Sequence, residues 1–292
     1  MRHKPAHYLQ FWVVRTLYFA LGLLPRRARG WCGVALGWAA SAIGIRRSVM
    51  RSNLEIAFPG IPQIGKSTII RRCFEHFGTV ATSLSVVHKI TASDCGNWLF
   101  PCGLEHLDRA VASGKGAIVV SGHLGNWEMV GTACARLGYP VSFVVTTQRN
   151  KLVQEWLDNV RRRAGVEIIP RKQAIKGVLS ALHRNRIVAI LIDQDAHEEG
   201  VFVPFFGKLS STPRGPAVFH LRTGCPLIFM SSYRLPGERY KFVLETVDIS
   251  EAQSQEEIMA KLTARLEQAI RVAPEQWFWM HKRWKSTPPA SS

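Results

Sequence analysis

Two residues whose types and spacing suit acid–base chemistry, His123 and Glu128, follow a short apolar run. The run Ala117–Ser121 is typical of a buried strand, and the glycine at position 122 lets the chain turn directly before the histidine. We expect Glu128 to bind one imidazole nitrogen, which leaves the other nitrogen free to accept a proton. His123 is then a general base oriented by a carboxylate. A buried structural histidine fits the same spacing.

The elements that must position this pair are a strand, a turn and a helix. Asn126 can cap the helix, whose first residues are then Trp127 and Glu128. This places His123 at the carboxyl end of a strand, where open α/β sheets bind their ligands. No G-x-S-x-G serine precedes it, so the pattern is not that of a hydrolase triad.

The remainder of the chain alternates between apolar runs and helical segments from about Thr91 onward. Strands are predicted at 117–121, 141–146, 166–169, 187–192 and 227–231, and helices at 68–87, 104–113, 151–164, 174–184, 216–222 and 256–272. This order predicts an α/β fold with a mixed, largely parallel sheet flanked by helices. Residues 240–246 alternate in polarity and are predicted to form an antiparallel edge strand.

A second polar cluster, Asp193, Gln194 and Asp195, follows the buried strand predicted at 187–192. Burying two acids beside a core strand is costly unless they are hydrogen-bonded. We therefore expect this cluster to position the substrate or to support His123; capping of the loop is the alternative.

Two further features are candidates for the same site. Phe205 and Phe206 belong to an apolar loop, 200–207, that either lines a channel for an apolar ligand or fills the core. Helical geometry places Arg161 beside the apolar face of its predicted helix, where it can hold an oxyanion or another anion. Arg162 is expected to form an ion pair with Asp158 in solvent.

The chain is strongly basic, with 38 Lys and Arg against 21 acids and a net charge of +17. Its first 54 residues hold nine Lys or Arg and no acid, around two apolar segments, 8–24 and 31–45. We expect residues 1–47 to be a membrane anchor, either spanning the bilayer or lying in its interface, and residues 48–292 to be the catalytic domain. The aromatic and leucine content argues against the alternative, a nucleic-acid-binding arm.

The six cysteines are scattered and have no metal-ligand spacing. They are expected to be reduced thiols in a protein that faces the cytosol. No cluster suggests a bound metal or another cofactor.

Several motifs, taken together, resemble the bacterial lipid A late acyltransferases. The segment 123–128 is similar to their His-x4-Asp/Glu motif. The segments 53–59, 193–195 with 203–207, and 279–285 fit as well, in order, within a resemblance that runs from about residue 8 to 288.

This resemblance implies an inner-membrane enzyme on the cytoplasmic face, with a glycerol-phosphate-acyltransferase-like α/β core. Such an enzyme moves an acyl chain from acyl carrier protein, or from coenzyme A as an alternative donor, to a hydroxyl of a lipid A precursor. The motif implies that His123 is the general base and that Glu128 orients it. Mycobacterial relatives acylate phosphatidylinositol mannosides, and in them an acid matching Asp193 supports the histidine.

Acyl transfer from a thioester needs a base and an oxyanion donor, but no metal and no enzyme nucleophile. An anionic acceptor and an acidic carrier protein would explain the basic residues expected around the site, which are Arg149, Arg171, Lys172, Arg214, Lys282 and Arg283. The substrate-binding candidates are Asn126, Gln194, Asp195, Phe205, Phe206 and Arg214. Three alternatives stay open: another glycolipid or phospholipid acceptor, a membrane-anchored lipid hydrolase, and a binding protein without catalysis.

Overall fold

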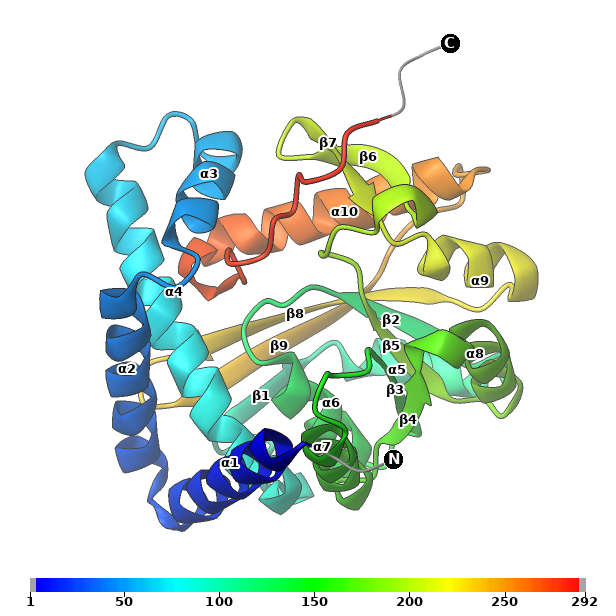
Figure 1. The fold of residues 1–292 in the computed structure, drawn as a ribbon. Helices are drawn as coiled ribbons and strands as arrows, with labels where there is room; N and C mark the ends of the chain where they lie inside the picture. Colours follow the sequence, from blue (N-terminus) through cyan, green and yellow to red (C-terminus); the bar gives the residue numbers. More distant parts are fainter. Residues whose placement is uncertain (1–3, 289–292) are drawn as a thin grey trace.

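The computed structural model describes residues 4–288, and within them a seven-stranded sheet forms the centre of the molecule (Figure 1). In spatial order its strands are β1 (Leu99–Cys102), β9 (Arg239–Thr246), β8 (Leu227–Leu235), β2 (Ala117–Ser121), β5 (Ile187–Leu191), β3 (Val141–Val145) and β4 (Glu167–Pro170). Neighbouring strands are parallel except β8 and β9. The mixed, mostly parallel sheet is confirmed.

One prediction about this sheet is wrong. Strand β9 is antiparallel to β8, as its sequence pattern suggested, but it is not an edge strand because β1 pairs with it on the outer side. The four-residue strand β1 was not predicted, because a run this short that contains a proline carries little strand signal.

Helices cover both faces of the sheet (Figure 1). One apolar core joins the sheet to α5 (Leu104–Ala112) and α6 (Trp127–Arg136). A second core, on the opposite face, joins it to α8 (Ala174–His183), α9 (Gly215–Thr223) and α10 (Gln255–Val272). Side chains of alternate residues in β2 enter these two cores, as expected for a strand buried on both faces.

Four helices precede the sheet: α1 (Pro5–Leu23), α2 (Arg26–Ile43), α3 (Arg47–Ala57) and α4 (Gln63–Ser83). Helices α2 and α4 approach closely through glycines. A Cβ atom placed on Gly78 would lie 2.0 Å from the carbonyl oxygen of Gly33, and one on Gly37 would lie 2.3 Å from that of Phe74. The N-terminal helices are therefore packed onto the body that carries the sheet.

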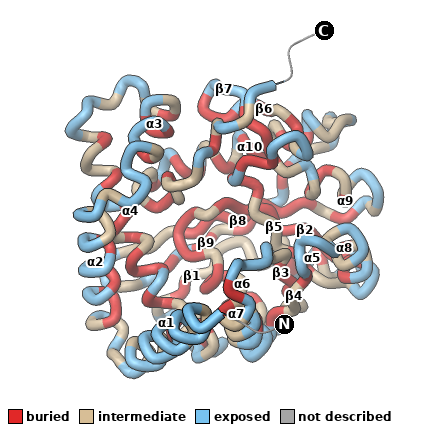
Figure 2. The backbone as a smooth tube through the Cα atoms, in the orientation of Figure 1, coloured by how far each residue is buried: buried red, intermediate tan, exposed pale blue. Residues whose placement is uncertain are grey.

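The outer surface of α1 and α2 is exposed and apolar (Figure 2). Its largest exposed side chains include Leu9 (69%), Phe19 (69%), Trp31 (74%) and Ile43 (77%). No helix among residues 4–288 has the length and apolar character needed to cross a membrane.

The apolar segment 200–207 forms a hairpin rather than a loop. Strands β6 (Val201–Phe205) and β7 (Lys208–Thr212) pair antiparallel around a turn at Phe206 and Gly207. The hairpin lies beside α10, and the C-terminal segment 274–286 runs between it and α4 (Figure 1).

Candidate active site

The central feature of the site is a hydrogen-bonded pair, His123 and Asp193. Strands β2 and β5 are parallel neighbours with Ser121 opposite Leu191, so the residues that follow both strands meet at one edge of the sheet. The imidazole Nδ1 of His123 lies 2.8 Å from Oδ1 of Asp193, and the backbone N–H of His123 donates to Oδ2 at 2.6 Å. The indole N–H of Trp277 donates to the same Oδ2 at 2.8 Å.

This arrangement favours a charged carboxylate and a basic histidine. Burial opposes ionisation of Asp193, but the charge of His123 and three hydrogen bonds outweigh it and lower the pKa of the carboxyl. Burial also opposes the protonated form of His123, but the charge of Asp193, their hydrogen bond and the charge of Glu128 outweigh it and raise the pKa of the imidazole. With Nδ1 donating to Asp193, Nε2 is the nitrogen that accepts a proton.

The hydrogen bond expected from Glu128 to the imidazole is therefore made by Asp193, which is a correction. The Glu128 carboxylate is held by Arg161, with Nε at 3.0 Å from Oε2 and Nη2 at 2.5 Å from Oε1. Glu128 is the second residue of α6, and a two-point contact with a guanidinium on α7 (Lys151–Arg163) occupies both of its oxygens. Glu128 acts on His123 through its charge rather than through a hydrogen bond.

Arg161 points inward and Arg162 is exposed, as helical geometry predicted, but their partners differ from the expected ones. Besides Glu128, Arg161 contacts Oδ1 of Asp158 at 3.1 Å. Arg162 donates instead to the side-chain oxygen of Asn159 at 2.9 Å. Because two carboxylates already neutralise Arg161, its guanidinium is not free to hold an oxyanion or a substrate anion in this structure.

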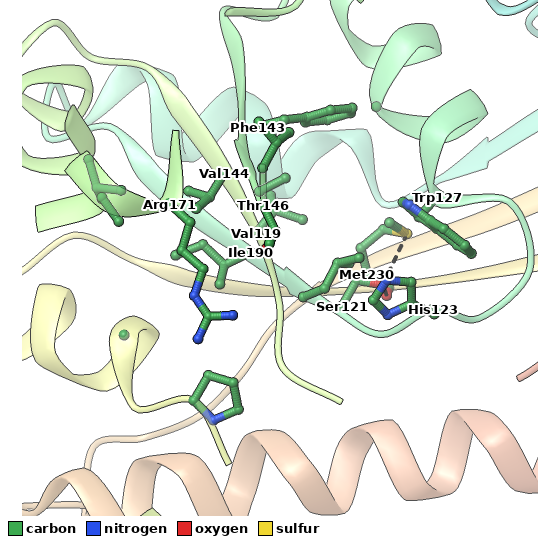
Figure 3. A pocket seen from close by; sticks show the side chains of 18 of the residues that line it. Val119, Ser121, His123, Trp127, Phe143, Val144, Thr146, Arg171, Ile190 and Met230 are labelled. Atoms are coloured by element: carbon green, nitrogen blue, oxygen red, sulfur yellow. Dashed lines mark hydrogen bonds between the residues drawn. The ribbon is translucent and has the colours of Figure 1, made fainter. Parts of the chain in front are cut away.

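A cavity of about 780 Å³ opens beside His123, and His123 forms part of its wall. Figure 3 shows His123 and Trp127 at one end of this cavity and Arg171 at the other. Besides His123, five of the predicted site residues line it, and these are Glu128, Arg161, Gln194, Asp195 and Arg214. Arg214 directly precedes α9.

Asp195, unlike Asp193, is tied to the C-terminal segment. Its Oδ2 accepts from the hydroxyl of Ser286 at 2.9 Å, and its backbone N–H donates to Nε2 of His281 at 2.8 Å. Asp195 therefore combines the two roles weighed for this cluster: it lines the cavity, and it holds the loop after β5.

Three predicted substrate-binding residues lie elsewhere, which corrects their assignment. Asn126 is fully buried: it caps α6 by accepting from the backbone N–H of Met129 at 3.2 Å and donates to the hydroxyl of Ser83 at 2.7 Å. Phe205 and Phe206 are buried in the core and pack against Trp284. The hairpin thus fills the core, because its alternating side chains face α10 and the C-terminal segment.

The basic residues expected around the site separate in the same way. Arg171 and Arg214 line the cavity, whereas Arg283 is buried, donates to the backbone of Ser211 and lies over the ring of Phe205. Arg149, Lys172 and Lys282 are exposed and are not among the residues of the cavity wall.

Sequence reasoning missed the residues that hold the histidine turn from behind. Leu124 pairs with Trp277, and the backbone N–H of Gly125 donates to Gln276 at 3.0 Å. Gly125 has φ +61°, and a Cβ there would lie 2.1 Å from a carbonyl oxygen of β8. Buried His76 of α4 donates from Nε2 to the carbonyl of Gly125 at 3.0 Å. Gln276 and Trp277 lie just before the segment 279–285 that fits the family pattern, but their contacts with the histidine turn could not be read from that segment.

No group of three or more His, Cys, Asp or Glu side chains among residues 4–288 is placed to hold a metal ion. The chemistry visible in this part of the chain is that of a general base beside an apolar cavity. A base of this kind can deprotonate a hydroxyl or a water molecule.

Residues 2–286 match the model of the bacterial lipid A biosynthesis acyltransferases. The chain belongs to this family. It is an acyltransferase, and a lipid or glycolipid acceptor follows from its membership.

Individual relatives of this acyltransferase have different acceptors in their names. The lipid A biosynthesis palmitoleoyltransferase of Escherichia coli K12 is 25% identical over 97% of this chain and 94% of its own. The lipid A biosynthesis lauroyltransferase of the same organism is 26% identical over 88% of this chain and 85% of its own. A phosphatidylinositol mannoside acyltransferase of Mycobacterium tuberculosis CDC 1551 / Oshkosh is 29% identical, over 62% of this chain and 58% of its own.

The first prediction for the acyltransferase concerns the pH dependence that Asp193 imposes. His123 must be neutral to act as a base, so kcat/KM rises as pH rises through the pKa of the imidazole. Asp193→Asn removes the charge that raises this pKa, so the acidic limb of the kcat/KM profile should move to lower pH. The plateau should fall by about 10²–10⁴-fold. An acidic limb that stays in place or moves to higher pH would show that Asp193 does not control His123.

The second prediction separates Arg161 from Arg162. Arg161→Ala leaves Glu128 without its partner, so the pKa of His123 should rise further and the acidic limb should move to higher pH. The free energy of unfolding should fall by about 1–3 kcal/mol, because two partly buried carboxylates lose hydrogen bonds. Arg162→Ala, the matched control, should leave both the pH profile and the melting temperature close to wild type. Equal effects of the two variants would contradict this assignment.

Proposed function

We propose that this acyltransferase moves a fatty acyl chain from the thioester of acyl carrier protein to a hydroxyl of a lipid A precursor. The observation that carries the proposal is the position of the Asp193-bound His123 at the wall of a cavity that enters the apolar core. A proton acceptor and a space for hydrocarbon then lie side by side, which is what acyl transfer to an alcohol requires.

The acyl chain would lie in the part of the cavity between the sheet and the helices α5 and α6. This apolar branch is lined by core side chains, among them Leu107, Val119, Val130, Cys134, Phe143 and Leu244. Cavities with such walls stay dry and accept apolar ligands. A chain that fills this branch from the His123 end would leave its thioester carbonyl next to the imidazole.

The reaction then follows from the tautomer of His123. Nε2 takes the proton of the acceptor hydroxyl as its oxygen attacks the thioester carbonyl carbon. The tetrahedral intermediate expels the thiolate as the C–S bond breaks, and the imidazolium returns the proton to the sulfur. Asp193 stabilises the imidazolium between these two steps, since its carboxylate is buried, charged and hydrogen-bonded to Nδ1.

We also propose that the enzyme lies at the cytoplasmic face of the inner membrane, with α1 and α2 in the interface. The exposed apolar surface of these helices and the absence of acids from residues 1–54 support this placement. Ile175 of α8 belongs to the cavity wall and is 68% exposed, so the cavity also has an exposed apolar side chain at its wall.

The similarity over nearly the whole length to lipid A enzymes supports a lipid A precursor as acceptor. The phosphatidylinositol mannoside enzyme is similar over a smaller part of the chain, so another glycolipid is the alternative acceptor.

The test of this function is acyl transfer by the purified protein, followed by mass spectrometry of the lipid product. Incubation with a series of acyl-acyl carrier proteins and a lipid A precursor should add one acyl chain to the lipid. His123→Ala should lower the rate by about 10²–10⁴-fold in a protein that remains folded, which circular dichroism can check. Release of free fatty acid in place of acylated lipid would identify a hydrolase, and a His123→Ala protein with wild-type activity would exclude the proposed base.

Membrane binding has its own prediction. Replacing exposed Leu9, Phe19 and Leu23 of α1 by serine should weaken sedimentation with anionic vesicles, because apolar side chains are lost from the proposed interface. The control carries serine at Ile64 and Val272, which are 81% and 73% exposed but lie on other helices. Equal vesicle binding by wild type and both variants would contradict an interfacial role for α1.

A further inference from the structure

Two arginines line the same cavity as His123 but take no part in the chemistry described above. Arg171 follows β4, and Arg214 directly precedes α9. Both side chains belong to exposed residues of the cavity wall, on the side of the sheet edge that faces α8 and α9 (Figure 3 shows Arg171). They therefore lie away from the apolar branch proposed for the acyl chain.

These two guanidinium groups differ from the third arginine of the cavity. Arg161 is held by Glu128 and Asp158, whereas neither Arg171 nor Arg214 has a hydrogen bond or ion pair from its side chain within residues 4–288. Two acids share their part of the wall. The carboxylate of Asp195 is bound to Ser286 and His197, and Glu199 is exposed. Within residues 4–288 the cavity thus contains two arginines that no carboxylate contacts directly.

The sheet gives the approximate distance between Arg171 and His123. His123 follows β2 and Arg171 follows β4, and the order β2-β5-β3-β4 separates these strands by three spacings. At about 4.8 Å each, the two residues are about 14 Å apart along the sheet edge. The cavity wall also contains three uncharged polar residues, Thr146, Gln148 and Gln194.

We propose that Arg171 and Arg214 form a subsite for a phosphate group of the substrate whose reacting atom lies at His123. The planar fork of a guanidinium matches phosphate oxygens and binds them in pairs. This proposal rests on the proposed function, and it adds a second point of recognition about 14 Å from the reacting carbon. The phosphate has two possible sources, the phosphopantetheine or coenzyme A part of the donor and the head group of the acceptor.

The kinetic experiment compares substrates that differ only in phosphate. The donor pair is a long-chain acyl-4′-phosphopantetheine and the same acyl group on pantetheine, and the acceptor pair is a phosphorylated glycolipid and its phosphatase-treated form. Arg171→Ala and Arg214→Ala should each raise KM about tenfold or more for the phosphate-bearing member of one pair and leave its phosphate-free partner unchanged. The affected pair identifies the source. Lys172→Ala, adjacent but outside the cavity wall, is the matched control.

A binding experiment without turnover keeps this inference separate from the proposed function. Calorimetric titration of the full chain with coenzyme A and with dihexanoyl phosphatidic acid should show that wild type and Lys172→Ala bind at least one probe. The two arginine variants should bind that probe about tenfold more weakly. If the wild-type protein transfers no acyl group but these affinities differ as stated, the proposed function is wrong and the phosphate subsite is supported. Absence of binding to either probe, or equal affinity in all variants, would overturn the subsite.

Discussion

The site depends on one buried carboxylate, that of Asp193. It is 2% exposed, and it stays ionised because an imidazole, a backbone N–H and an indole N–H all donate to it. An unpaired charge at such depth would cost several kcal/mol. Removing any one of the three donors therefore destabilises the ionised form of Asp193. In return the carboxylate fixes the tautomer of His123 and raises its basicity. The position, the protonation state and the reactivity of His123 thus all depend on the Asp193 carboxylate.

The carboxylate of the His-x4-Asp/Glu motif, that of Glu128, has a different task. Glu128 is bound to Arg161, which also binds Asp158, so α6 and α7 are joined by a charge network beside the base. Helix α7 in turn contacts α1, where Trp156 packs against Tyr18. Side-chain contacts therefore connect α1, the helix proposed to lie at the lipid surface, to α7, and α7 to Glu128, whose charge acts on His123.

The local parts of the site and a supporting role of Asp193 toward His123 could be predicted from sequence, but the exchange of Glu128 for Asp193 as the hydrogen-bond partner of the imidazole could not. The strand at 117–121, the turn at His123 and the cap at Asn126 depend on neighbouring residues, and the structure contains all three. The partner of the imidazole depends on strand order instead. Asp193 reaches His123 only because β5 lies directly beside β2, and no spacing within the sequence encodes that neighbour. Trp277 was missed because its contact with Asp193 joins residues 84 positions apart in the chain. Phe205 packs against Trp277 in the core and does not line the cavity.

The wide separation of the catalytic partners along the chain has a consequence for folding. His123 lies 70 residues from Asp193, and Asp193 lies 84 from Trp277, so no single supersecondary unit contains the site. Parallel pairing between distant strands forms late and at a high entropic cost. Partly folded chains with only local structure would have no competent base and could not discharge acyl thioesters wastefully. Loss of catalysis on heating should accordingly coincide with loss of the central sheet, which makes enzymatic activity a sensitive reporter of the global fold.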